Sequence, residues 1–129
     1  MQDYRKLEVW RRAHQLTLQV YRCSASFPRE EVYSLTSQIR RAAASIPANI
    51  VEGCGRESNA DFARFLQIAV GSAHELEYHL LLAKDLTYLS EQDHNRVTSE
   101  TAEVKKMLSG LLGRVRSGGI QPSRNDTRV

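Results

Sequence analysis

Apolar residues recur at spacings of three and four along most of this 129-residue sequence, and no long stretch alternates apolar with polar residues. Spacings of three and four follow the turn of an α-helix, whereas alternation is typical of a half-buried strand. This pattern predicts an all-α chain. It also excludes folds that need a sheet, among them the dinucleotide-binding folds, although the stretch GCG at residues 53–55 resembles part of their glycine motif.

Four helices account for the pattern, over residues of about 6–26, 34–54, 59–87 and 91–116. Phe27 and Pro28 end the first, because the residue before a proline disfavours helical backbone. The pairs Ser58/Asp61 and Ser90/Asp93 have capping-box spacing at the third and fourth starts. Short connections make neighbouring helices antiparallel, so we expect an elongated up-down-up-down four-helix bundle over residues 1–116. Residues 117–129 lack an apolar repeat and are expected to form a disordered tail.

The composition narrows the class of protein. Hydrophobic residues make up 41% of the chain and charged residues 26%, close to the averages for soluble proteins. No apolar run is long enough to span a bilayer, so we expect a cytoplasmic protein without a membrane partner. Cys23 and Cys54 lack the spacing typical of zinc sites or disulfide frameworks. We expect reduced thiols that fill space in the core.

Arginine dominates the charge of the chain. Lys and Arg number 18 against 15 Asp and Glu, and fourteen of the 18 are arginine, whose planar fork suits phosphates and carboxylates. Solvated helix surface is one interpretation of these residues. The other is a surface that contacts nucleic acid, for which the candidates are Arg11, Arg12, Arg40, Arg41, Arg56, Arg64, Lys105 and Lys106.

The segment from 38 to 56 carries features that helices usually avoid. Pro47 lacks the N–H that would bond the Ala43 carbonyl, at a typical cost of about 3 kcal/mol. The small residues around it would fit a kink against another backbone. Gly53 and Gly55 predict a helix exit through a left-handed residue. A polar stripe with helical spacing also crosses the segment. Its residues are Gln38, Arg41, Ser45, Asn49, Glu52 and Arg56. The stripe is either a solvated face or a hydrogen-bonding seam against a second subunit.

Two helices have more apolar positions than one core readily buries. On the third helix they are Phe65, Ile68, Leu82 and Leu86, and on the first they are Val9, Leu16 and Cys23. Apolar surface left over in this way commonly marks a subunit contact. Together with the polar stripe, it gives a candidate oligomer interface made of Gln38, Arg41, Ser45, Asn49, Glu52, Phe65 and Ile68.

Motifs for catalysis or metal binding do not fit the sequence. In HELEYH, His74 and His79 are five residues apart, whereas the zinc-protease motif needs a spacing of four on one helix face. Di-iron bundles need Glu-x-x-His pairs, and no nucleophile motif is found. We expect a non-enzymatic protein with no metal, cofactor or small-molecule substrate. His14 is interpreted as a core or interface histidine.

Four segments resemble a known family: LEVWRRAHQL, FPREEVYSLTSQIRRAAASIPANIVEGCGRES, DFARFLQIAVGSAHELEYHLLLA and KMLSGLL. They are similar to the four-helix bundle proteins named for the 23S rRNA intervening sequence, over about residues 4–115. Val51 stands where that family usually has alanine. The resemblance implies a small bacterial protein that assembles into a ring, a homopentamer. Related accessory proteins of diversity-generating retroelements associate with nucleic acid and a reverse transcriptase, which the resemblance adds as partners.

Two hypotheses for function remain. In the first, the homo-oligomer binds RNA or DNA without reading its sequence, since five subunits at +3 would carry about +15. In the second, the oligomer is a protein-interaction scaffold without nucleic-acid contact, and its arginines pair with carboxylates of neighbouring subunits. Arg41 with Glu52 of a neighbour is the pair expected in that case.

Overall fold

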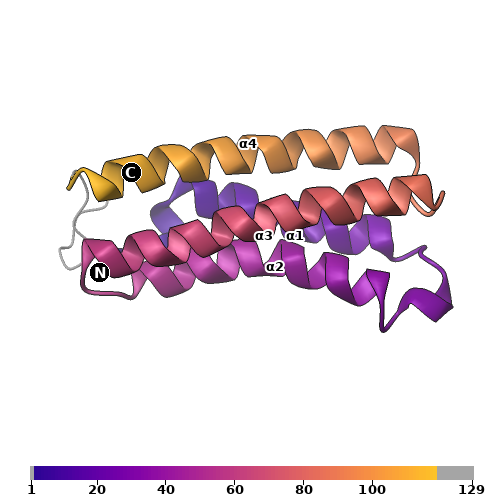
Figure 1. The fold of residues 1–129 in the computed structure, drawn as a ribbon, viewed down its shortest axis with the longest axis horizontal. Helices are drawn as coiled ribbons and strands as arrows, with labels where there is room; N and C mark the ends of the chain where they lie inside the picture. The colour runs from indigo at the N-terminus through magenta and orange to yellow at the C-terminus, as the bar shows by residue number, and fades with distance from the viewer. Residues whose placement is uncertain (1, 119–129) are drawn as a thin grey trace.

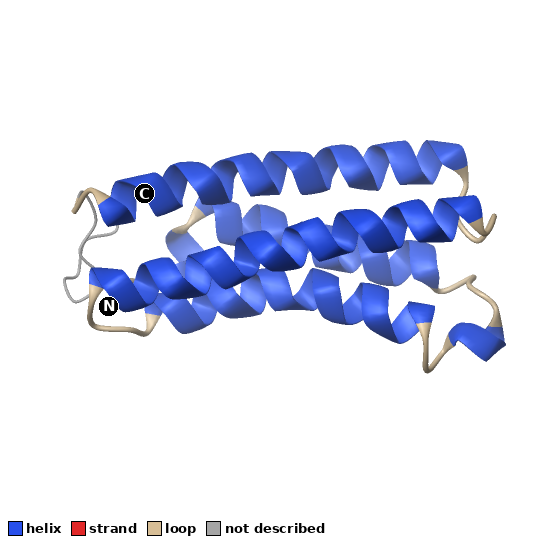
Figure 2. Ribbon diagram, in the orientation of Figure 1, coloured by secondary structure: helices blue, strands red, loops and turns tan. Residues whose placement is uncertain are grey.

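The computed structural model describes residues 2–118, and the prediction of an all-α bundle is confirmed there. Figure 1 shows an elongated molecule whose long helices lie lengthwise, and Figure 2 shows no strand among residues 2–118. The helices are α1 (Glu8–Ser24), α2 (Leu35–Cys54), α3 (Asn59–Asp85) and α4 (Glu91–Arg116), with short 3-10 turns η1 (Tyr4–Lys6) and η2 (Arg29–Glu31). Residues 119–129, most of the expected tail, lie outside the described part.

The four helices occupy the corners of a square. α1 contacts α2 and α4, and α3 also contacts α2 and α4. Within residues 2–118, no Cα atom of α1 lies within 8 Å of one of α3, and none of α2 lies within 8 Å of one of α4. Helices that follow each other in sequence run in opposite directions (Figure 1). α1 and α3 are therefore at diagonally opposite corners, and their outward faces point in different directions.

Capping residues set the starts of the last two helices. Ser58 Oγ accepts a hydrogen bond from the Asp61 N–H at 3.1 Å, and Ser90 Oγ accepts one from the Asp93 N–H at 3.0 Å. Such bonds satisfy backbone donors that have no partner in the first turn. α1 is shorter than expected by two residues at each end, since extended Leu7 precedes it. α3 ends at Asp85 instead of residue 87, where Thr87 has a φ of 65°.

Most of the apolar residues that were predicted to form a subunit contact are buried or half-buried within the single chain. Val9 and Leu16 are buried within the single chain, and Phe65 is only 9% exposed. The expectation that these three face another subunit is wrong, because a helix packed between two neighbours buries a wide apolar stripe. Leu82 and Cys23 are half-buried. Only Ile68 and Leu86 of that set are largely exposed, at 42% and 43%.

The helix α2 passes through Pro47 without a break in its helical assignment, and Pro47 is buried. The Thr17 hydroxyl of α1 lies 3.1 Å from the Ala43 carbonyl oxygen and donates to the group that Pro47 leaves without a partner. α2 ends at Cys54, as predicted, but the exit is not left-handed, since Gly55 has a φ of −83°. The need for glycine lies at Gly53, where a Cβ atom would stand 2.9 Å from the ring of Phe62.

Candidate nucleic-acid and subunit interfaces

The eight candidate cations do not form one surface. Arg11 and Arg12 lie on α1, and Lys105 and Lys106 lie on α4 next to it. The remaining four lie on α2, on α3 and in the turn between them, and these are Arg40, Arg41, Arg56 and Arg64.

An ion pair joins α1 to α4. Arg12 Nη2 lies 3.0 Å from Glu100 Oε2 and 3.2 Å from Oε1, with Nε at 3.4 Å, and both side chains are about one-third exposed. The hydrogen bonds to Glu100 raise the pKa of the Arg12 guanidinium. Arg12 is thus held as part of the fold and its charge is neutralised locally.

Two of the other candidate cations on the α1–α4 side, Arg11 and Lys106, face solvent. Arg11 pairs with Glu8 at 2.9 Å, and both side chains are more than half exposed. Lys106 is exposed and has no partner within residues 2–118. It borders a hollow of about 300 Å³ between the two helices, together with Glu8, Glu103 and Arg114. Of the candidate cations on this side, Arg11 and Lys106 are the ones that a phosphate can reach.

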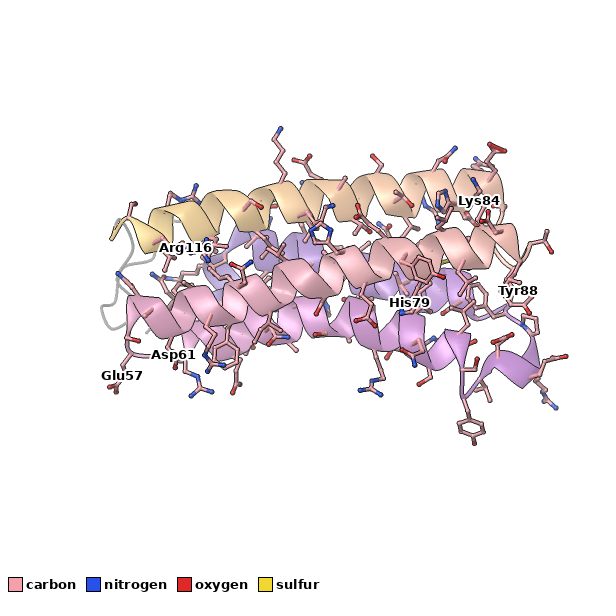
Figure 3. The ribbon with its side chains drawn as sticks, in the orientation of Figure 1. Glu57, Asp61, His79, Lys84, Tyr88 and Arg116 are labelled. Atoms are coloured by element: carbon pink, nitrogen blue, oxygen red, sulfur yellow. The ribbon has the colours of Figure 1, made fainter. Side chains whose placement is uncertain are left out.

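A neutral cluster forms where α2 passes into α3. The guanidinium groups of Arg56 and Arg64 lie 4.7 and 4.4 Å from the ring centre of Phe65. Arg64 Nε is 3.0 Å from Asp61 Oδ1, and Arg56 Nε is 3.8 Å from Oδ2. Arg56 Nη2 is also 2.9 Å from Glu52 Oε1. Figure 3 shows Asp61 at this end of the bundle. Two cations and two anions leave no excess charge here.

Three further cations have different roles. Arg40 donates to Ser24 Oγ at 2.8 Å and to the Tyr21 carbonyl at 3.3 Å, so it satisfies acceptors in the last turn of α1. Lys105 donates to Glu77 at 2.8 Å and ties α4 to α3. Arg41 is exposed and has no partner within residues 2–118. Only Arg41 and Lys106 of the eight candidates are therefore unpaired in the described part of the chain.

The middle of the polar stripe meets α3 of the same chain. Ser45 and Ser72 share a hydrogen bond of 2.8 Å between their Oγ atoms, and Asn49 Nδ2 donates to the Ser45 carbonyl at 2.8 Å and to its Oγ at 3.0 Å. Ser45 and Asn49 consequently have partners without a second subunit. Gln38, Arg41 and Glu52 of the stripe are exposed, and Glu52 pairs with Arg56.

The solvent-facing side of α3 carries three exposed apolar side chains among polar ones. Ile68 is 42% exposed, Tyr78 59% and Leu81 43%. Between them, Gly71 has no atom within 4 Å of the position of a Cβ. A helix with apolar residues on its outward face as well as its core face is typical of one that is covered on both sides.

The sequence and the fold both resemble those of known proteins. The sequence profile of the 23S rRNA-intervening sequence protein family matches residues 5–110. The chain belongs to this family. A crystal structure of a protein with unknown function from the S23 ribosomal protein family of Bacteroides thetaiotaomicron VPI-5482 is 26% identical, with a TM-score of 0.76 over 81% of this chain and 95% of that one. No curated protein matches the chain.

This 23S rRNA-intervening sequence protein has no group of three potential metal ligands among residues 2–118. The two histidines of HELEYH pair separately, His79 with Glu75 at 3.1 Å and His74 with Glu77 at 3.8 Å. Burial raises the pKa of the Cys54 thiol to about 12 and also raises that of Cys23, which disfavours nucleophilic thiolates. None of the helices in the described part is apolar over a length that could cross a membrane.

Several residues of these surfaces were not found from the sequence of this family member. Glu100 and Ser72 are partners of residues 88 and 27 positions away, so no local pattern indicated them. Tyr78 and Leu81 could have been predicted from the sequence, because Tyr78 comes seven residues after Gly71 and Leu81 three after Tyr78, which places all three residues on the same side of a helix. His14 was expected in a core or an interface, but it is exposed and stacks on Trp10, so the core interpretation is wrong.

Proposed function

We propose that this protein is a non-enzymatic homo-oligomer that binds nucleic acid through its phosphates. The subunits associate through the outward face of α3, defined by Ile68, Tyr78 and Leu81. The nucleic acid contacts the side formed by α1 and α4, where Arg11 and Lys106 face solvent. The family and the fold are compatible with this function, and the proposal itself depends on how the two faces are placed.

The observation that carries the proposal is the diagonal arrangement of α1 and α3, whose Cα atoms lie more than 8 Å apart throughout residues 2–118. Association through α3 buries three exposed apolar side chains and leaves α1 free. Each added subunit then repeats the same arginine-bearing helix on the outside of the assembly. Repetition matters because one subunit has a net charge of only +3, whereas the attraction to a polyanion grows with the number of phosphates contacted.

Arg11 can exchange its partner for a phosphate at little cost. Its pair with Glu8 is exposed, and such surface pairs are typically worth less than about 1 kcal/mol. Lys106 has no hydrogen-bond or ion-pair partner within the described residues, so a phosphate would displace nothing there. Arg12 differs, because its bidentate contact with Glu100 links two helices. We therefore assign phosphate contact to Arg11 and Lys106 and a supporting role to Arg12.

The test combines the mass from light scattering with a titration of labelled RNA at low and moderate salt. We expect a mass of several subunits and an affinity that falls as salt rises. Arg11→Glu and Lys106→Glu should each weaken binding and lower the salt slope by about one. Arg29→Glu makes the same change in charge on η2, at the opposite end of α1, and should have a smaller effect.

Assembly is tested separately. Ile68→Glu places a charge in the α3 face and should reduce the mass, while Val32→Glu, at a residue 49% exposed outside that face, should not. A monomeric wild-type protein would contradict the oligomer. Binding that is indifferent to salt, or to Arg11→Glu, would contradict the phosphate contact.

The scaffold hypothesis has one observation in its favour, the neutral cluster around Phe65. Arg56 and Arg64 are already paired with Glu52 and Asp61, so that end of the molecule is suited to a protein surface more than to a polyanion. An assembled protein that binds no RNA or DNA at low salt would support the scaffold and exclude the first proposal.

A further inference from the structure

An aromatic column stands on the outward side of α1 near its start. The rings of Trp10 and His14 are four residues apart on one helix face, with centres separated by 5.2 Å and planes inclined by 5°. Tyr4 of η1 meets the indole edge-on at 4.9 Å and 66°. Tyr4 and Trp10 are half-buried, whereas His14 is exposed. The column thus begins against the core and ends in solvent with a flat imidazole ring.

The column borders a hollow of about 450 Å³. That volume is in the range of small-ligand sites. The hollow is lined by Glu8, Trp10, Arg11, Arg12, His14 and Gln15. Arg12 is fixed by Glu100 and forms a wall, while Arg11 is held only by its exposed pair with Glu8. The site combines a stacked aromatic surface with a cation that can be released to an incoming anion.

Polar groups next to the stack are free to make contacts. Neither ring nitrogen of His14 nor the side-chain amide of Gln15 has a hydrogen-bond partner within residues 2–118. An imidazole and an amide both offer donors and acceptors in the plane of the group. These are the contacts that the edge of a heterocyclic ring can satisfy while its face lies on an aromatic side chain.

We infer that this hollow binds an unpaired base of a single-stranded nucleic acid. The base stacks on the Trp10–His14 column, Gln15 contacts its edge, and Arg11 contacts the adjoining phosphate. A single strand is required because in a duplex each base face is covered by its neighbours, whereas unpaired bases can lie on aromatic side chains. The inference rests on the proposed nucleic-acid binding and adds the form of the nucleic acid and the residues that hold its bases.

The chain offers a direct probe, since Trp10 is its only tryptophan. Indole fluorescence is recorded while the full chain is titrated with a short unlabelled oligoadenylate, and the anisotropy of the same oligonucleotide with a label is followed in parallel. We expect quenching and anisotropy to change over the same concentrations. A duplex of matched length should bind through its phosphates without quenching the indole.

Substitutions separate stacking from charge. His14→Ala should weaken single-strand binding by between about 5-fold and about 150-fold, the range for loss of one base stack. His14→Tyr keeps a ring at this position and should restore most of the affinity. The matched control is His74→Ala, which removes another exposed histidine on α3 and should leave binding unchanged. Circular dichroism of each variant checks that the helices are intact.

The outcomes distinguish the inference from the function on which it rests. No change in anisotropy at low salt would overturn the proposed nucleic-acid binding itself. A rise in anisotropy without quenching, or equal affinities of His14→Ala and His74→Ala, would overturn the stacking site and leave phosphate binding in place. Equal quenching by duplex and single strand would overturn the preference for unpaired bases.

Discussion

The Thr17 hydroxyl on α1 lies 3.1 Å from the carbonyl oxygen of Ala43 on α2. This carbonyl is the one whose helical partner is missing, because Pro47 has no N–H to donate. The same hydroxyl is 2.9 Å from the Ala13 carbonyl of its own helix. The single hydroxyl proton is shared between the two carbonyls, so a side chain from a neighbouring helix partly replaces the donor that the proline removes. The helix α2 continues through Pro47 into its last two turns.

Thr17→Val keeps the shape of this side chain and removes the donor. We expect it to lower the free energy of unfolding by about 1–2 kcal/mol, the cost of a buried carbonyl left without a partner. Urea denaturation measures the change. In a Pro47→Ala background the N–H of residue 47 can bond the Ala43 carbonyl, so the same substitution should cost less than half as much. An equal cost in both backgrounds would show that Thr17 acts in another way.

Gly53→Ala and Gly71→Ala should have opposite effects. A Cβ at position 53 would stand 2.9 Å from Phe62 Cδ1 and 3.1 Å from Phe65 Cβ, so we expect a loss of about 1–3 kcal/mol from overpacking. Position 71 is open, and alanine there should add up to about 1 kcal/mol through helix propensity. Both are measured by thermal denaturation in the Ile68→Glu background, which removes any contribution from assembly. Stabilisation by Gly53→Ala would refute the close contact.

The carboxylate of Glu31 should make the free energy of unfolding depend on pH in the acid range. Its carboxylate accepts hydrogen bonds from Ser34 Oγ, the Leu35 N–H and the Tyr88 hydroxyl, and these lower its pKa below 4.5. Figure 3 shows Tyr88 at the end of the bundle opposite Asp61. Since the folded pKa is lowered, the contribution is present above pH 4.5 and is lost as the pH falls through the folded value.

Glu31→Gln should therefore flatten the fall in stability between neutral and acid pH, measured by urea denaturation at a series of pH values. Glu30→Gln changes the same charge at an adjacent exposed residue that has no side-chain partner in the described part, and should leave the profile close to that of the wild type. Identical profiles for the two variants would contradict a special role for Glu31.

The two thiols should differ in reactivity. With a pKa of about 12, roughly one Cys54 thiol in 10⁴ is ionised at pH 8. We expect iodoacetamide to modify half-buried Cys23 slowly and to modify buried Cys54 only when the chain unfolds, as followed by peptide mass spectrometry. In urea the two rates should converge. Rapid native modification of Cys54 would contradict its burial.

Patterns between neighbouring residues predicted the helices well. The contacts between different helices could not be predicted from the sequence. The serines that cap α3 and α4 were found because a capping bond spans only three residues. Val9 and Leu16 were misassigned because the width of the buried stripe depends on how closely two neighbouring helices approach. The candidate cations could be listed from the sequence, but their carboxylate partners could not, since Glu100 and Glu77 come from other helices.

The sequence by itself determined that this chain forms four antiparallel helices and belongs with the 23S rRNA-intervening sequence proteins, because helical periodicity and caps are properties of neighbouring residues. Tertiary structure decided which arginines remain available, which apolar face stays exposed and how the chain accommodates Pro47. Those outcomes depend on distances between side chains far apart in the sequence. Such distances are fixed only when the helices pack, and packing is what places α1 and α3 at opposite corners.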